Sequence, residues 1–300
     1  MKKFVLKLAL FAALICVVDV SFGFVCNYLR DHTKGGMSGN KDYICRKSNE
    51  DIIMMGSSRM RHHYVPQMIE DSLGVTCYNA GIDGNGIIMS YGFLKMITDR
   101  YTPKAIIYDV SGFDLYEDDN SKYLGSLRSY YEFEGIRDVF ADVDDSERLK
   151  MRSSLYKYNS NFMGLLADNI HPSYTFEKGY WPSYETMDYE PEAKNEELGP
   201  IDSLKLSYLE KFIKLSEEKE ISLVFCASPT YYTTYNEHFY DPVKSLCNKY
   251  NVPFLDYYGY EEMCCDKKYF SNATHLNDVG ARVYTSTIIN ELREILKFKI

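Results

Sequence analysis

Five short apolar runs, each followed by a polar or glycine-rich cluster, constrain the fold of this chain most strongly. The runs lie at 51–55, 75–78, 105–110, 221–226 and 253–255, and amphipathic helical patterns separate them. Apolar strands that alternate with helices are typical of a parallel sheet covered on both faces. The sequence therefore predicts an α/β fold: a three-layer α/β/α, doubly wound, flavodoxin-like parallel sheet with about five strands.

This alternation stops at about Glu117 and resumes near Ile201, which predicts a partly helical insertion at 117–200 that packs over one edge of the sheet. The insertion holds 9 basic and 18 acidic residues, in a chain with 34 Lys+Arg and 43 Asp+Glu. That excess of acid argues against nucleic acid as a partner. The insertion is also rich in tyrosine, which suits either carbohydrate binding or a small aromatic core of its own.

Residues 4–26 form a mostly apolar segment, and the basic residues Lys2, Lys3 and Lys7 lie at or near its start. A segment of this length spans one bilayer, and positive charge stays on the cytoplasmic side. Asp19 and the bulky residues around the possible cleavage site make signal-peptide cleavage unfavourable. We therefore expect a single-pass membrane anchor in preference to a cleaved signal or a buried helix of the soluble domain. A juxtamembrane linker at 27–50 and the α/β domain at 51–300 would then lie outside the cytoplasm, in the periplasm or at the cell exterior.

Ligands of such folds bind beyond the carboxyl ends of the parallel strands. Gly56-Ser57-Ser58-Arg59 follows the first strand, where a serine hydroxyl can project above the sheet while its backbone N–H faces a developing oxyanion. The alternative is that Ser57 or Ser58 only caps the following helix. His275 falls between the fifth strand and the last helix, at the same edge. A serine and a histidine in that layer can act as nucleophile and base.

The second strand ends in Asn79-x-Gly81-x-x-Gly84. Its glycines allow backbone amides to approach a substrate, or they are ordinary turn residues. Neither a dinucleotide fingerprint nor a phosphate-binding loop occurs in the sequence. No paired C-x-x-C spacing suggests zinc, and adjacent histidines are weak evidence for a metal. We therefore expect no cofactor and no metal.

Together, Ser58 after the first strand, N-x-G-x-x-G after the second and H-L-N-x-x-G-A from His275 resemble the SGNH/GDSL hydrolase superfamily. The resemblance spans about 50–115 and 201–295 and is greatest to membrane-anchored bacterial members related to polysaccharide O-acetyltransferases and esterases. It implies that Ser58 is the nucleophile and His275 the general base. It also implies that the backbone amides of Ser58 and Gly84 form part of an oxyanion hole.

Two positions depart from the pattern of that superfamily. Phe113 stands where a third oxyanion donor, an asparagine, is expected, and Asn272 stands where an aspartate orients the histidine. An asparagine carbonyl can still accept the imidazole N–H, although Asp→Asn in a serine triad can lower the rate about ten-thousandfold. Asp278 and Asp256 are alternative partners for the imidazole. Further substrate contacts are expected from polar and aromatic residues near the strand ends: Arg59, Asn79, Asp114, Ser228 and Tyr231.

The expected function is a serine esterase or O-acyltransferase that acts on acyl esters of a cell-envelope glycan through a Ser58–His275 acyl-enzyme. The alternative is a catalytically inactive relative that binds a glycan or serves as a scaffold in an envelope export or modification complex. Phe113 and Asn272 favour that alternative. A third interpretation, a flavodoxin-like cofactor binder, would make the protein coloured.

Overall fold

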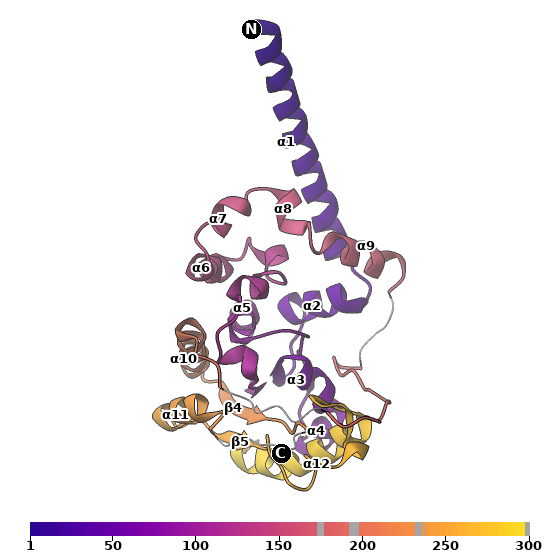
Figure 1. Cartoon of the computed structure of the whole chain (residues 1–300), viewed down its shortest axis with the longest axis vertical. Helices are drawn as coiled ribbons and strands as arrows, with labels where there is room; N and C mark the ends of the chain where they lie inside the picture. The colour runs from indigo at the N-terminus through magenta and orange to yellow at the C-terminus, as the bar shows by residue number, and fades with distance from the viewer. Residues whose placement is uncertain (173–176, 192–197, 232–235, 237, 298–300) are drawn as a thin grey trace. The chain divides into compact units, whose positions relative to one another are not determined.

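The computed structural model describes residues 1–172, 177–191, 198–231, 236 and 238–297 (Figure 1). The chain forms two compact units. Unit 1 comprises Met1–Tyr43 and Asn120–Thr175, and unit 2 comprises Ile44–Asp119 and Phe176–Ile300. The insertion expected at 117–200 is therefore divided, because its larger part groups with the N-terminal segment and its last part with the α/β unit. The expected linker at 27–50 is largely helical, since it contains the end of α1 (Lys2–Asp31) and α2 (Gly36–Arg46).

Unit 2 contains a five-stranded sheet in the order β2-β1-β3-β4-β5, and every pair of neighbours is parallel. The strands are β1 (Ile52–Gly56), β2 (Cys77–Asn79), β3 (Ala105–Asp109), β4 (Ser222–Ala227) and β5 (Phe254–Asp256). This order is that of a flavodoxin-like sheet, which confirms the predicted fold class. Gly56 pairs with Asp109, and Asp109 with Cys226, so the carboxyl ends of β1, β3 and β4 lie at one edge.

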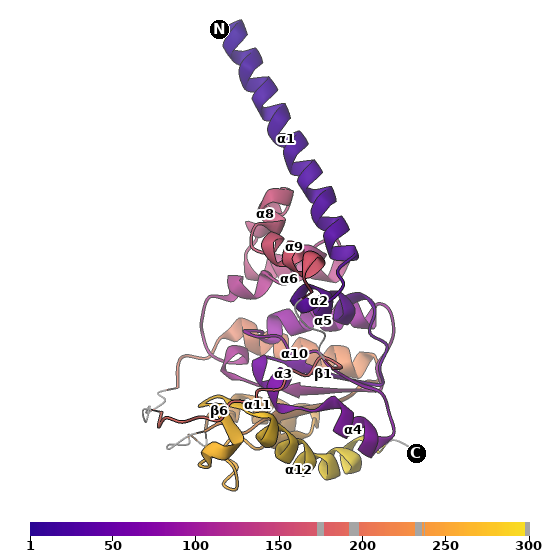
Figure 2. The ribbon, with the colours of Figure 1, turned by 90° about the vertical axis from the view of Figure 1, so that its right-hand side faces the viewer.

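Helices cover both faces of this sheet (Figure 2). The helices α5 (Ile87–Thr98) and α10 (Ser203–Glu218) pack together on one face, whereas α3 (Ser58–His63), α4 (Pro66–Leu73) and α12 (Asp278–Leu296) share the other. The helix α11 (Asp241–Tyr250) lies beside α10. Under α12, Met54 and Ile107 of the sheet join Ile288 and Leu292 in one fully buried cluster. Burial of apolar side chains on both sheet faces explains why the strands are continuous apolar runs.

The helical pattern after β1 forms two helices instead of one. Val65 adopts an extended conformation, with φ −99° and ψ 102°, because the ring of Pro66 disfavours helical geometry in the preceding residue. The second helix, α4, ends at Gly74 with φ +69°, a conformation that favours glycine. The short helix α3 is thereby separated from the rest and keeps its own orientation at the end of β1.

A small antiparallel hairpin lies between β5 and α12, and the apolar pattern does not indicate it. Its strands, β6 (Phe270–Asn272) and β7 (His275–Leu276), follow the 3₁₀ turn η4 (Lys267–Tyr269). Asn272 pairs with His275 across the hairpin. Strands of two or three residues are too short for an alternation of apolar and polar residues to reveal them.

Unit 1 is helical in the part that the structure describes. Its elements besides α1 are most of α2, η2 (Asn120–Leu124), η3 (Arg128–Tyr130), α6 (Glu134–Val143), α7 (Glu147–Lys150), α8 (Ser154–Tyr158) and α9 (Phe162–Ile170). Tyr123, Tyr130 and Tyr158 are buried, so part of the tyrosine-rich sequence forms a core. The helix α1 is long and apolar enough to cross a membrane, a property that a membrane anchor shares with a signal sequence.

Candidate active site

The turn between β1 and α3 places Ser58 in the first turn of a helix at the carboxyl edge of the sheet. Gly56 has φ +149°, and a Cβ atom there would lie 2.8 Å from the backbone oxygen of Asp109, so the turn requires glycine. Ser57 caps α3, because its hydroxyl accepts a hydrogen bond from the backbone N–H of Arg59 at 3.4 Å. Capping therefore falls to Ser57, and the hydroxyl of Ser58 is available to another partner.

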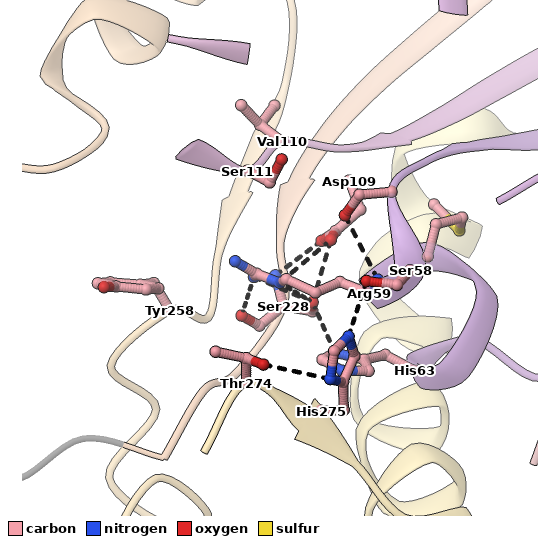
Figure 3. Close-up of polar contacts among 12 residues, drawn as sticks. Ser58, Arg59, His63, Asp109, Val110, Ser111, Ser228, Tyr258, Thr274 and His275 are labelled. Carbon is pink, nitrogen blue, oxygen red and sulfur yellow. Dashed lines mark hydrogen bonds and ion pairs between the residues drawn. The ribbon is translucent and has the colours of Figure 1, made fainter. Parts of the chain in front are cut away.

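That partner is His275 (Figure 3). The Oγ atom of Ser58 lies 2.7 Å from Nε2 of His275, although 217 positions separate the two residues in the chain. Ser58 comes from the start of α3 and His275 from β7. The distance is within hydrogen-bond reach, which is the geometry that proton transfer from a serine to a histidine requires.

Asn272 occupies the other side of the imidazole. Its Oδ1 atom lies 3.1 Å from Nδ1 of His275 and also accepts hydrogen bonds from the backbone N–H groups of Thr274 and His275 at 3.0 and 3.1 Å. Because backbone N–H groups only donate, the amide must present its oxygen to the ring. His275 therefore carries its proton on Nδ1, and Nε2 is left to accept the proton of Ser58.

The imidazole of His275 is held in its neutral form. Burial, together with the neighbouring His62 and Arg59, lowers its pKa to about 4 against an opposing effect of Asp83. Near pH 7 the ring is therefore unprotonated. A neutral imidazole is the form that acts as a general base.

The two aspartates that could orient the imidazole instead have other partners. Asp278 accepts a hydrogen bond from the hydroxyl of Tyr180 at 2.9 Å and forms an ion pair with Arg282 at 2.9 Å. Asp256 lies 2.8 Å from Nζ of Lys244. The contacts of the imidazole thus favour Asn272 over Asp278 and Asp256 as its orienting residue.

The loop after β2 contains Gly84, the second residue expected in an oxyanion hole. Gly84 has φ +66°, so the loop needs glycine for its conformation. Asn85, which the sequence did not single out, is buried and donates to the backbone oxygen of Gly56 at 3.3 Å and to Ser90 at 2.8 Å. This amide ties the loop to the end of β1, directly before Ser58. Phe113, by contrast, has no side-chain N–H to offer an oxyanion.

Asn79 and Asp114 were expected to contact substrate, but both side chains are buried and bonded within the protein. The amide of Asn79 donates to the backbone oxygens of Met60 and Tyr64 at 2.7 and 3.0 Å, and so holds the end of α3. The carboxylate of Asp114 accepts from Tyr108 at 2.7 Å and from the backbone and hydroxyl of Ser111 at 2.6 and 2.9 Å. Burial raises the pKa of Asp114 to about 6. These two residues position the loops that they belong to.

Arg59 and Ser228 were also expected at the substrate, yet they belong to a buried network behind Ser58 (Figure 3). The guanidinium of Arg59 donates to Oγ of Ser228 at 3.0 and 3.1 Å, to its backbone oxygen, and to Tyr240 at 3.1 Å. It also lies 3.4 Å from the carboxylate of Asp109. Arg59 is 8% exposed and Ser228 is fully buried. Asp109 closes the network, and its place at the end of β3 is the only signal in the sequence that could have indicated it.

His63 links this network to the hairpin that carries His275. Its Nε2 atom accepts the backbone N–H of Leu276 at 3.0 Å, and its Nδ1–H therefore donates to Oγ of Ser228 at 2.8 Å. Burial and the charge of Arg59 hold the pKa of His63 well below its usual range. A neutral, fully buried His63 thus joins α3, the end of β4 and β7 by hydrogen bonds.

Tyr231, the last of the expected substrate contacts, is 6% exposed. Its backbone N–H donates to Ala273 at 2.9 Å, its hydroxyl donates to Glu190 at 3.2 Å, and its ring packs on Phe270 with centroids 5.5 Å apart. Tyr231 therefore supports the hairpin from outside and does not form an open wall of the site.

The last part of the insertion runs beside α3 within unit 2. The backbone N–H of Trp181 donates to the backbone oxygen of Arg61 at 3.1 Å, and its own backbone oxygen accepts from Nδ1 of His62 at 2.7 Å. The guanidinium of Arg61 lies over the Trp181 ring, 5.5 Å from its centroid. The rings of His62 and His275 are 5.3 Å apart. Trp181 therefore contacts His62, whose ring lies beside that of His275, and the sequence did not indicate this proximity.

Within the described ranges, no group of three or more His, Cys, Asp or Glu side chains could hold a metal ion. The adjacent residues His62 and His63 point to different partners, Trp181 and Ser228. The side chains that gather at this edge are instead those of serine nucleophile chemistry.

A scan against protein-family models matches none, and a search of curated proteins finds no relative of this chain. Among solved structures, a psychrotrophic esterase from a Pseudoalteromonas species is 9% identical with a TM-score of 0.44, over 83% of this chain and 100% of that chain. An acetylxylan esterase from Geobacillus stearothermophilus is 9% identical with a TM-score of 0.44, over 84% and 96%. A GDSL-like lipase from Bacteroides thetaiotaomicron is 9% identical with a TM-score of 0.37, over 80% and 87%. At this level of similarity the matches assign neither a reaction nor a substrate to the chain.

The lowered pKa of His275 predicts how the reactivity of Ser58 depends on pH. Protonation of Nε2 removes the base, so the rate at which a fluorophosphonate labels Ser58 should stay constant from pH 7 to about 5 and fall by half near pH 4. Gel-based labelling rates of the full chain across this range measure the midpoint. A midpoint near 6.5, the value of an unperturbed histidine, would contradict the burial of the imidazole.

The network around Ser228 predicts a loss of stability when its hydroxyl is removed. In Ser228→Ala the buried Nδ1–H of His63 loses its acceptor, which costs about 1–3 kcal/mol and lowers the melting temperature of the full chain in detergent. Ser286→Ala, on the exposed face of α12, is the matched control and should leave the melting temperature nearly unchanged. Equal effects of the two substitutions would argue against the network.

Proposed function

We propose that this protein is a serine esterase or O-acyltransferase that acts on acyl esters of a cell-envelope glycan. The observation that carries the proposal is the 2.7 Å contact between Oγ of Ser58 and Nε2 of a neutral His275, whose Nδ1 faces Oδ1 of Asn272. A nucleophile, a base and a group that orients the base are the parts that acyl transfer through a covalent intermediate requires.

In the first half of the reaction, Oγ of Ser58 attacks the ester carbonyl carbon while its proton passes to Nε2 of His275. The carbonyl oxygen gains the negative charge of the tetrahedral intermediate. The backbone N–H of Ser58, at the N-terminus of α3, and that of Gly84 would donate to this oxygen. The intermediate then collapses, the bond to the alcohol breaks, and the departing oxygen takes the proton from His275. An acyl group remains on Ser58.

In the second half, His275 removes a proton from the acceptor hydroxyl as this oxygen attacks the acyl carbon. The bond to Ser58 breaks, and the proton returns from His275 to Oγ. Water as acceptor gives hydrolysis, whereas a sugar hydroxyl gives an O-acylated glycan. Both outcomes use the same acyl-enzyme, so the position of the acceptor in the site decides between them.

Asn272 makes this site weaker than one with a carboxylate. An asparagine oxygen holds the ring in the productive tautomer, but it carries no charge to stabilise the imidazolium that forms in the transition state. Because the backbone of Thr274 and His275 fixes the orientation of the amide, the loss is smaller than in a triad whose asparagine selects the wrong tautomer. A slow acyl transfer suits a polymer that the enzyme meets at high local concentration on the same membrane.

The cell-envelope substrate is proposed from the N-terminal segment and from aromatic residues of the insertion. Lys2, Lys3 and Lys7 lie in the first two turns of the apolar helix α1, which would place the rest of the chain outside the cytoplasm. Trp181 lies beside His62 near the nucleophile, and Tyr184 is 81% exposed. Flat aromatic side chains with polar tips are suited to sugar rings.

A second function, a non-catalytic subunit that binds a glycan or a partner of an envelope export or modification complex, is favoured by Phe113 and Asn272. Phe113 cannot donate a hydrogen bond to an oxyanion. Asn272 lacks the negative charge that an aspartate would place beside the imidazole of His275. Such a subunit would keep the fold and lose the reactivity of Ser58, so the same experiments separate the two functions.

Labelling by a fluorophosphonate probe tests the enzyme proposal. The full chain should be labelled at Ser58 and should hydrolyse p-nitrophenyl acetate, and Ser58→Ala should abolish both. Ser57→Ala is the matched control, because it removes the neighbouring hydroxyl and its helix cap at a cost of about 1 kcal/mol, yet leaves the contact with His275 intact. Absence of labelling in the wild-type chain, together with glycan binding that His275→Ala does not change, would support the scaffold instead.

Replacing the orienting amide with a carboxylate should accelerate the enzyme. Asn272→Asp keeps the acceptors for the backbone of Thr274 and His275 and adds a charge beside Nδ1, so kcat should rise about tenfold or more and the acid limb of the rate should move to higher pH. Asn290→Asp makes the same chemical change on the exposed side of α12 and should alter neither quantity. An unchanged rate and acid limb in Asn272→Asp would show that Asn272 does not orient the base.

A further inference from the structure

The helix α1 has two parts that differ in their surroundings within unit 1. Side chains from Phe4 to Val18 are exposed and mostly apolar, whereas Gly23, Cys26 and Arg30 are buried. Phe22 packs against Phe162 with ring centroids 5.0 Å apart. The second part of α1 is therefore an integral element of unit 1, although it also exposes the apolar side chains of Val20, Phe24 and Val25.

Asp19 marks the transition between these parts. Its carboxylate accepts hydrogen bonds from the hydroxyl of Ser153 at 2.6 Å and from the backbone N–H groups of Ser154 and Leu155 at 3.0 and 2.8 Å. These N–H groups belong to the start of α8, so Asp19 supplies the negative charge that a helix N-terminus favours. The start of α8 is consequently fixed at the level of Asp19 along α1, and Figures 1 and 2 both show α8 beside this helix.

The part of α1 that precedes Asp19 is too short to cross a bilayer alone. At 1.5 Å per residue, the stretch from Phe4 to Val18 spans about 22 Å, whereas the hydrocarbon core is about 30 Å thick. If α1 spans the membrane, its exposed apolar side chains Val20, Phe24 and Val25 complete the span, and Asp19 and the start of α8 lie in the outer part of the bilayer. The surface of unit 1 at this level therefore meets the lipid.

The side chains exposed at this level fit such a boundary. Leu155 follows the capped N-terminus of α8 and is 40% exposed, and Met163, next to the Phe162 that contacts α1, is 69% exposed. Arg152, one residue before the hydroxyl that binds Asp19, is also exposed. Two apolar side chains and one basic side chain are what an interface of acyl chains and anionic headgroups accommodates.

Another exposed apolar residue of unit 1 lies elsewhere. Ile170 is 60% exposed at the far end of α9, where the neighbouring Asn169 donates to the backbone oxygen of Leu29 at 2.9 Å. Leu29 lies ten residues farther along α1 than Asp19, about 15 Å at the rise of an α-helix. Ile170 is therefore outside the boundary and serves as an internal comparison.

We propose that unit 1 is a membrane-seated platform: Leu155 of α8 and Met163 of α9 insert into the interface of the same bilayer that α1 crosses, with Arg152 at the lipid headgroups. Contact through α1, α8 and α9 would hold unit 1 rigidly on the membrane surface, whereas a flexible tether would leave it free to tilt.

Tryptophan quenching by brominated lipids tests this arrangement, because Trp181, in unit 2, is the only tryptophan of the chain. In a Trp181→Phe background, the full chain carries Leu155→Trp, Met163→Trp, Ile170→Trp or Leu14→Trp and is reconstituted into vesicles of phosphatidylcholine and phosphatidylglycerol. The lipids are brominated either near the headgroup or deep in the acyl chain. Should Trp181→Phe be unstable, the same substitutions are placed in the wild-type chain and its signal is subtracted.

The expected result is strong quenching of Leu155→Trp and Met163→Trp by lipids brominated near the headgroup, weaker quenching by deep bromines, and none for Ile170→Trp. Leu14→Trp, within the apolar stretch, should be quenched most by deep bromines. If Leu155→Trp and Met163→Trp are quenched no more than Ile170→Trp, the platform is wrong. If Leu14→Trp is not quenched, α1 does not span the bilayer and the proposal fails as well. Neither readout depends on ester hydrolysis, so it is independent of the proposed function.

Discussion

The buried ion pair of Arg59 and Asp109, with Ser228 and His63, is the interaction on which the geometry of the site depends. It joins α3, the ends of β3 and β4, and the hairpin that follows β5. Burying a charged pair is costly unless hydrogen bonds satisfy its remaining polar atoms. Here the hydroxyl of Ser228 accepts from the Arg59 cation and from the neutral His63 while it donates to the carboxylate of Asp109. The network thereby connects the segment that carries Ser58 to the segment that carries His275.

Besides this network, two uncharged groups determine the chemistry of the site: the neutral imidazole of His275 and the amide of Asn272. His275 is buried next to other histidines and Arg59, so its pKa lies well below its usual value and the ring is a base across the physiological range. Asn272 orients the ring without contributing charge. The arrangement favours a ready base over a stabilised imidazolium, which is a compromise between ground-state population and transition-state stabilisation.

The strands and most helices could be predicted from the sequence, because apolar runs of three to six residues and helical periodicity are local signals. The helix boundary at Pro66 and the hairpin that carries Asn272 and His275 are local features too. They involve too few residues for a helical or alternating apolar pattern to reveal them. The division of the insertion was not predictable. Asp19 on α1 bonds to α8 more than a hundred residues later, and such long-range pairing leaves no periodic trace.

The sequence by itself determined the topology and, with it, the edge where Ser58 and His275 lie, because the carboxyl ends of parallel strands share one side of a sheet. Tertiary structure alone decided which of the other polar side chains at that edge remain open to a ligand. Arg59, Asn79, Asp114, Ser228 and Tyr231 all follow or precede strand ends, yet each is buried and bonded inside the protein. The reason is that the partner of a polar side chain is chosen by three-dimensional proximity, which residue type and spacing along the chain do not encode.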